Sequence, residues 1–154
     1  MMAMVAKVFT GVKRSGEMLR SVEKIFQRKD SLSICPFYDI ATEYRVIMLD
    51  GRCMLCFGKQ KTPDGWKFNL CQGASAYEVE EGALKEELVT IARKAMETIG
   101  IRFASVDIVK LKTGEFMMIE VNSGVMIHHY TKFVANGREI AKRIYQEAIE
   151  KMLQ

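Results

Sequence analysis

The sequence contains no apolar run of the roughly 18 residues that a membrane-spanning helix requires. It also lacks a strong excess of one charge, because 23 basic residues are balanced by 19 acidic ones and the net charge is +4. This small positive charge suits an anionic ligand such as a nucleotide but does not require a nucleic acid. No repeat, low-complexity tract or polybasic arm is present. We therefore expect neither a membrane nor a nucleic-acid partner.

The sequence shows no signal peptide, and its four cysteines therefore indicate a reducing, cytoplasmic environment. Cys53 and Cys56 have the CxxC spacing found in zinc and redox sites. Both lie in an apolar segment that resembles a strand, in which residues three apart point to opposite faces. We therefore interpret the pair as structural.

With 154 residues, the chain is long enough for one domain with a sizeable core. Helical spacing, β-branched runs and the turn signal Asp50-Gly51 define its predicted elements. In chain order these are strand 5–12, a helix from Ser15 to about 30, strand 31–38, hairpin strands 42–49 and 52–60, an extended piece 66–70, helix 80–100, strands 101–111 and 115–121, and a helix from about 136 whose inward residues are Ile140, Ile144, Ala148 and Met152. The predicted fold is α+β, an antiparallel sheet backed by helices.

The second predicted hairpin carries a candidate metal site. If the two-residue turn Thr113-Gly114 joins its strands, Lys112 pairs with Glu115 and Asp107 lies opposite Glu120. Opposed carboxylates repel, and they are costly in apolar surroundings, so a cation is expected between them. The alternative is a hairpin whose carboxylates point into solvent, and a three-residue loop would shift the register by one.

Asn122 lies two residues beyond Glu120, on the same face of the predicted strand. Two carboxylates and an amide oxygen form a ligand set that favours Mg²⁺ or Mn²⁺ over zinc. Magnesium held by few protein ligands completes its shell with water and phosphate. The set therefore predicts a nucleotide or phosphoryl substrate.

Taken in order, the motifs resemble the ATP-grasp superfamily over roughly residues 8–130. The matching pieces are Glu43-Tyr44-Arg45-Val46 with Asp50-Gly51, Lys59, Asn69-Leu70 with Gln72-Gly73, the helix around 84–99, Val106-Asp107, and Ile119-Glu120-Val121-Asn122-Ser123. The nearest subgroup resembles ribosomal-protein glutamate ligases and glutathione synthetases.

The resemblance implies a role for each matching residue. Asp107, Glu120 and Asn122 would hold Mg²⁺ or Mn²⁺ on the phosphates of ATP. Arg45 and Lys59 would neutralise charge on the transferred phosphoryl group. Asn69 would assist near the metal or the γ-phosphate, while Cys35 and Phe37 belong to the segment expected to bind adenine through its backbone.

The family chemistry implied is phosphorylation of a carboxylate substrate by ATP, followed by attack of an amine on the acyl phosphate. Several family features have no match in this sequence, namely an N-terminal substrate domain and a glycine-rich phosphate loop. Pro36 stands where a hinge glutamate is usual, Lys59 where arginine is frequent, and Gly124-Val125 where proline-glycine is usual.

We therefore expect residues 1–154 to form a single partial domain of a carboxylate–amine ligase that is inactive alone. The alternative is a non-catalytic interaction module derived from the same fold. Because a partial sheet leaves apolar edges exposed, we predict a homo-oligomer in either case. An independent magnesium-dependent phosphoryl enzyme ranks last, because no general base or nucleophile accompanies the carboxylates.

Overall fold

The computed structural model describes residues 15–27, 38–63 and 67–153, and the chain divides into two units, residues 1–38 and 39–154. In the first unit the described element is helix α1 (Ser15–Gln27), where a helix was expected. The predicted strand 5–12 lies outside the described residues, as does nearly all of the predicted strand 31–38, including Cys35 and Phe37.

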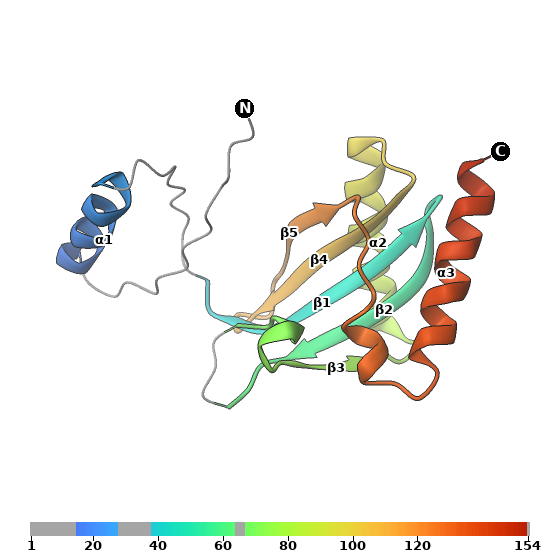
Figure 1. The fold of residues 1–154 in the computed structure, drawn as a ribbon, viewed down its shortest axis with the longest axis horizontal. Helices are drawn as coiled ribbons and strands as arrows, with labels where there is room; N and C mark the ends of the chain where they lie inside the picture. Colours follow the sequence, from blue (N-terminus) through green and yellow to red (C-terminus); the bar gives the residue numbers. More distant parts are fainter. Residues whose placement is uncertain (1–14, 28–37, 64–66, 154) are drawn as a thin grey trace. The chain divides into compact units, whose positions relative to one another are not determined.

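The second unit is built on an antiparallel sheet with the strand order β3-β2-β1-β4-β5 (Figure 1). The predicted α+β fold is thereby confirmed. The elements are β1 (Ile40–Leu49), β2 (Arg52–Gln60), the short 3₁₀ turn η1 (Leu70–Gln72), β3 (Ser75–Glu78), α2 (Ala83–Ile99), β4 (Phe103–Leu111), β5 (Phe116–Asn122), the 3₁₀ turn η2 (Tyr130–Lys132) and α3 (Gly137–Met152). None of the helices in the described residues is both long and apolar enough to cross a membrane.

Each face of this sheet is covered by one long helix (Figure 1). Leu88, Ala92 and Met96 of α2 are buried against one face, in a cluster that includes Val46 and Val106. On the other face, α3 and the segment after β5 pack on a second apolar cluster. Its buried residues are Ile47, Leu55, Phe57, Val125, Ile127, Tyr130 and Ile144. Burial of these two stripes is the main stabilisation that the sequence pattern provides.

The helix boundaries follow their capping signals, with two differences from the sequence prediction. Helix α2 begins at Ala83 rather than Glu80, and Gly100 ends it in the left-handed conformation with φ 75°, its N–H donating to Met96 O at 2.8 Å. Met152, expected to face inward, is 56% exposed. Helix α3 therefore leaves the sheet after Ala148, its last buried residue.

The β1–β2 hairpin has the predicted turn, because Asp50 and Gly51 both adopt positive φ, 47° and 76°. A β-bulge at Met54 follows, since Ile47 pairs with Leu55 while Met48 pairs with Cys53. The extra residue places Cys53 and Cys56 on the same face, against the α2 cluster. Our expectation of opposite faces is wrong for this reason. Both thiols are nevertheless packed in the core region, and burial raises the pKa of each.

The β4–β5 hairpin differs from the assumed turn but preserves the expected opposition of carboxylates. Leu111 N–H donates to Glu115 O at 2.9 Å, and Lys110 pairs with Phe116, so the loop is one residue longer than expected. A β-bulge at Ile119 then shifts the register back. Asp107 consequently pairs with Glu120, as predicted, although the predicted pairing of Lys112 with Glu115 is wrong.

Candidate functional site: a charged cluster on the sheet

A group of charged side chains continues the face of the sheet that α3 covers. Along β1, Glu43 and Arg45 precede Ile47 at the two-residue spacing that keeps side chains on one face. Arg45 pairs with Asp107 of β4, and Glu43 pairs with Lys59 of β2. The charged cluster, as we use the term, consists of Glu43, Arg45, Lys59, Asp107 and Glu120.

Hydrogen bonds centred on Asp107 join this cluster. Arg45 donates from Nε to Asp107 Oδ1 at 2.8 Å and from Nη2 to Oδ2 at 2.6 Å. Lys59 Nζ donates to Glu43 Oε1 at 2.5 Å and to Asp107 Oδ1 at 3.2 Å. Lys59 and Asp107 are only 5% and 3% exposed. Both oxygens of Asp107 are thus engaged by cations in a nearly dry environment, where such pairs are strong.

Burial and charge act in opposite directions on these groups. Burial alone would raise the pKa of Asp107, but the hydrogen bond from Arg45 and the charge of Lys59 outweigh it and hold the pKa below 3.8. For Glu43 the outcome is reversed, because burial raises its pKa above 4.5 despite the neighbouring ammonium of Lys59. Burial would lower the pKa of Arg45, yet Asp107, Glu43 and Glu120 raise it. Asp107 is therefore a persistent anion between two persistent cations.

The predicted metal ligands occupy the adjoining edge of the sheet. Glu120 lies directly across from Asp107, and Asn122 lies across from Ser105 on the same pair of strands. Within the described ranges, the structure places no three or more His, Cys, Asp or Glu residues so that they could share a metal ion. The oxygen donors on this edge are therefore two carboxylates and an amide.

The structure does not group every predicted ligand with the cluster. Asn69 caps the turn η1, where its Oδ1 accepts hydrogen bonds from Cys71 N at 3.2 Å and Cys71 Sγ at 3.0 Å. Its role as a nucleotide ligand stays a prediction. The same holds for Cys35 and Phe37, which lie outside the described residues.

Two residues of this face received no role from the sequence. Glu43 shares Lys59 with Asp107, and Ser105 places a buried hydroxyl beside Asn122. Both were detectable in principle, because each lies two residues before a predicted site residue, Arg45 or Asp107, and so on the same face of its strand.

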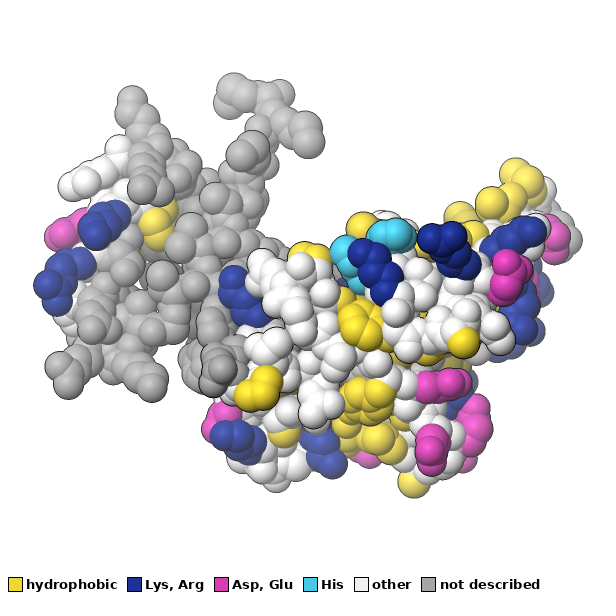
Figure 2. Space-filling model, turned by 60° about the horizontal axis from the view of Figure 1, so that its bottom comes forward, with side chains coloured by type: hydrophobic (Ala, Val, Ile, Leu, Met, Phe, Trp, Pro, Cys, Tyr) yellow, Lys and Arg dark blue, Asp and Glu magenta, His cyan; other side chains and the backbone are white. Residues whose placement is uncertain are grey.

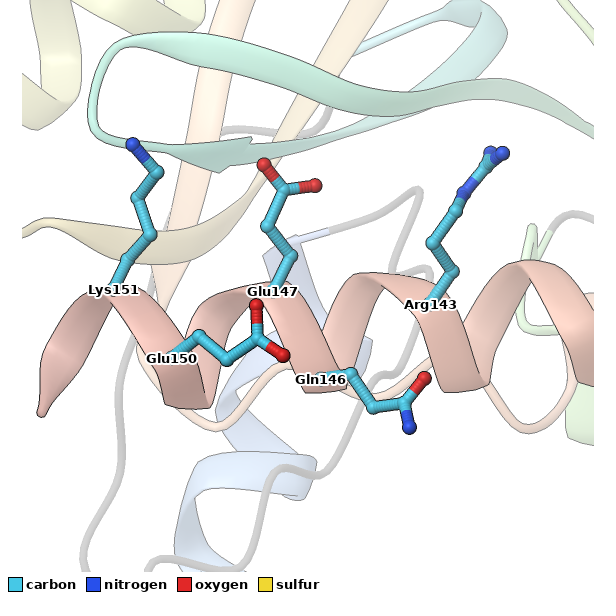
Figure 3. Close-up of a pocket in the computed structure, with 5 residues that line it drawn as sticks. All are labelled: Arg143, Gln146, Glu147, Glu150 and Lys151. Carbon is cyan, nitrogen blue, oxygen red and sulfur yellow. The ribbon is translucent and has the colours of Figure 1, made fainter.

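Two hollows lie near the cluster or on α3. One, of about 480 Å³, adjoins Lys59 and is lined also by Thr42, Lys61, Phe68 and Tyr77 among others. The second, of about 470 Å³, is lined by residues of α3 alone, Arg143, Gln146, Glu147, Glu150 and Lys151 (Figure 3). Arg143, Glu147 and Lys151 point toward the β1–β2 hairpin, and Arg52 forms an ion pair with Glu147. Because a single helix lines this second hollow, we assign it no ligand.

The remaining surface offers no competing charged site on the face shown in Figure 2. Basic and acidic side chains are interspersed there among hydrophobic ones, over the described part of the chain. This agrees with the modest net charge of +4. The charged cluster, which is mostly buried, is accordingly the most distinctive ionic feature that we find in the described residues.

Comparison with known families decides the assignment. Residues 3–142 match a family described as an ATP-grasp domain, the third family of one clade of that superfamily. The chain belongs to this ATP-grasp family. It is 31% identical over 111 residues to probable alpha-L-glutamate ligases of Shewanella halifaxensis (strain HAW-EB4) and Shewanella pealeana (strain ATCC 700345 / ANG-SQ1). Each match covers 72% of this chain but only 23% of the relative, so this ATP-grasp domain spans less than a quarter of either protein.

Solved structures show the same fold at low sequence identity. A RiPP-associated ATP-grasp ligase of Chryseobacterium gregarium, in complex with ADP and a leader and core peptide, is 15% identical with a TM-score of 0.59, and the match covers 94% of this chain and 43% of that one. D-alanine–D-alanine ligase from Bacillus anthracis, complexed with ATP, is 20% identical with a TM-score of 0.55, covering 73% and 38%. The resemblance to ATP-grasp ligases is thereby confirmed at the level of the fold.

Proposed function

We propose that this ATP-grasp domain is the part of an ATP-dependent carboxylate–amine ligase that binds the metal ion and the nucleotide phosphates. The observation that carries the proposal is the charged cluster, in which two cations converge on Asp107 beside Glu120 and Asn122. Membership of the family and the ligase relatives support it. They do not favour the alternative of a non-catalytic interaction module.

The residues of the cluster fit a metal ion that arrives together with phosphate. Magnesium is commonly held by one or two carboxylates plus substrate phosphates, rather than by a complete protein cage. Asp107, Glu120 and Asn122 offer such a partial set, and Mg²⁺ or Mn²⁺ bound there would withdraw charge from the phosphates. Phosphate oxygens would also give Arg45 and Lys59 new anionic partners, which would release the oxygens of Asp107.

Arg45 and Lys59 are proposed to neutralise the transferred phosphoryl group. A guanidinium has five N–H donors, of which Asp107 uses two, and the side chain of Arg45 remains 21% exposed. In the proposed reaction, a substrate carboxylate oxygen attacks the γ-phosphorus of ATP and ADP leaves. An amine then attacks the acyl carbon, phosphate leaves, and a C–N bond forms. The chain's contribution is positioning and charge neutralisation.

The rest of the ligase lies beyond what this domain supplies. We propose that residues 1–154 form one partial domain, without the substrate domain and phosphate loop of a full ligase, because the chain spans 23% of its relatives. It would then be inactive alone. The name of those relatives makes L-glutamate the first amine to test. The carboxylate partner is left open, and a cytoplasmic location stays a prediction.

Calorimetric titration with ADP, with and without Mg²⁺, tests the proposal. Wild-type protein should bind ADP more tightly with Mg²⁺, and the double variant Asp107→Asn, Glu120→Gln should lose that gain. Glu115→Gln is the matched control, because Glu115 is an exposed carboxylate on the same hairpin and should leave binding unchanged. Mg²⁺-independent binding, or no binding by the wild-type chain, would contradict the proposal.

A further inference from the structure

Ser105 carries a buried hydroxyl that nothing in the free protein satisfies. The residue is 1% exposed, and its Oγ has no hydrogen-bond partner within the part of the chain that the structure describes. Such groups are uncommon, because a hydroxyl removed from water without a partner destabilises the folded state. A buried orphan hydroxyl beside a functional site is therefore expected to have a partner in another state of the protein.

The register of the sheet identifies that partner. Ser105 lies between Ile47 of β1 and Asn122 of β5, with Asp107 two residues further along its own strand. Ile47 is fully buried and has no polar side-chain atom. Asn122 is partly exposed and directly opposite, and side chains in such pairs have Cβ atoms only about 4.5–5.5 Å apart. The polar side chain in register with Ser105 is thus a proposed metal ligand.

The chemistry of an amide makes this arrangement directional. An asparagine can offer its oxygen to a cation only if its NH₂ group points elsewhere, and that group then needs an acceptor. We propose that Ser105 is a positioning residue for Asn122: its Oγ accepts a hydrogen bond from the amide NH₂ when the amide oxygen turns to the metal ion. This inference rests on the proposed function and assigns its metal site a residue outside the predicted ligand set.

The proposal gives Ser105 opposite effects on the free and the liganded protein. Without a ligand the hydroxyl is unsatisfied, so Ser105→Ala should leave the free protein as resistant to urea as the wild type, or more so. With Mg²⁺ and ADP the hydroxyl fixes the amide. Loss of a residue that orients a metal ligand weakens metal affinity roughly 10- to 100-fold. The Mg²⁺-dependent part of ADP binding should weaken by that factor, while binding of ADP without Mg²⁺ should not change.

A matched control separates this role from the general effect of removing an orphan hydroxyl. Tyr130 also has a buried hydroxyl without a partner in the described chain, but its ring stacks on Phe57 at 4.6 Å, in the apolar cluster under α3. Tyr130→Phe should therefore keep Mg²⁺-dependent ADP binding at the wild-type level. A purely structural effect would move both variants alike.

The decisive experiment is a double-mutant cycle with Asn122→Ala, read by calorimetric titration of the 154-residue chain with ADP and Mg²⁺. Ser105→Ala should weaken Mg²⁺-dependent binding in the wild-type background and have no further effect when Asn122 is already alanine. Equal losses in both backgrounds, or no loss in either, would overturn the role of Ser105 while leaving the proposed function intact. If the wild-type chain shows no Mg²⁺-dependent binding, the proposed function and this inference both fail.

Discussion

Arg45 and Asp107 face each other on β1 and β4 and share two hydrogen bonds, of 2.8 Å from Nε and 2.6 Å from Nη2. The two sides of this pair differ in exposure, because the side chain of Arg45 is 21% exposed and that of Asp107 only 4%. Asp107 also receives Lys59 from the other side. Every donor or acceptor of this pair that could serve a new ligand therefore lies on the arginine side until the aspartate is released.

Asp107→Asn should destabilise the fold considerably. The substitution leaves the cations of Arg45 and Lys59 adjacent, with Glu43 as the remaining carboxylate in hydrogen-bond contact with Lys59. Breaking a buried ion pair by removing one partner costs about 3–5 kcal/mol, so we expect the free energy of unfolding measured in urea to fall by roughly that amount.

Asp50→Asn provides the comparison for this loss. Asp50 forms a similar two-bond pair with Arg102, but at the surface, where ion pairs contribute little. Asparagine also tolerates the left-handed conformation of this turn residue. Its urea transition should stay close to that of the wild type. Equal effects at positions 107 and 50 would show that burial of the cluster contributes nothing to stability.

Metal and phosphate should bind cooperatively. In the free protein both oxygens of Asp107 are bonded to cations, so a metal ion alone must displace Arg45 and Lys59 without compensation. Mn²⁺ titrated alone and followed by its paramagnetic signal should bind at least about tenfold more weakly than in the presence of ADP. By linkage, Mn²⁺ should tighten ADP binding by the same factor. Equal Mn²⁺ affinity with and without ADP would contradict the arrangement.

The sequence was sufficient to predict the two hairpins but not their local geometry. Asp50-Gly51 specified the first turn because its backbone requires two positive φ angles, which few other residue pairs accept. The two bulges, at Met54 and Ile119, left no such signal. One of them placed Cys53 and Cys56 on one face against expectation, and the other offset an error in loop length. The predicted Asp107–Glu120 opposition was therefore correct for an incomplete reason.

The ionic network was not predictable because it depends on contacts between distant segments. Periodicity places Arg45 and Asp107 on faces of their own strands, but only the register of β1 on β4 brings them together across 62 residues of sequence. The resemblance suggested Arg45 and Lys59 as phosphate ligands and Asp107 as a metal ligand. It gave no indication that these residues satisfy one another in the free protein.

Chemical modification should distinguish the cysteines. Cys71 is exposed, whereas burial raises the pKa of Cys53 and raises that of Cys56 from 9.0 to about 12. Because the thiolate is the reactive form, iodoacetamide at about pH 8 should label Cys71 and spare the other two. A Cys35→Ser background removes the cysteine that lies outside the described residues. Mass spectrometry should find one adduct in buffer and three in denaturant, and two or more in buffer would contradict the packing of β2.

The exposed edge of the sheet should support self-association. Strand β5 has no further strand beyond it in the described part of the chain, and Met118 and Ile119 are 40% and 46% exposed. We expect light scattering to give at least a dimer mass, and Ile119→Lys to reduce it. Leu153→Lys is the control, because Leu153 is 83% exposed but lies just beyond α3, away from this edge. A monomer mass for the wild type at all concentrations would end this prediction.

The start of α3 should be intolerant of any side chain at Gly137. A Cβ atom there would lie 2.4 Å from Thr131 Cα and 2.6 Å from Thr131 O, which are backbone atoms and cannot rotate away. Overpacking of this kind costs roughly 1–3 kcal/mol, so Gly137→Ala should lower the free energy of unfolding by at least about that amount. Gly124→Ala is the matched control, because nothing lies within 4 Å of its added Cβ. If both variants unfold at the wild-type urea concentration, η2 and α3 are not held together as the structure shows, and the covering of the site face by α3 would have to be reconsidered.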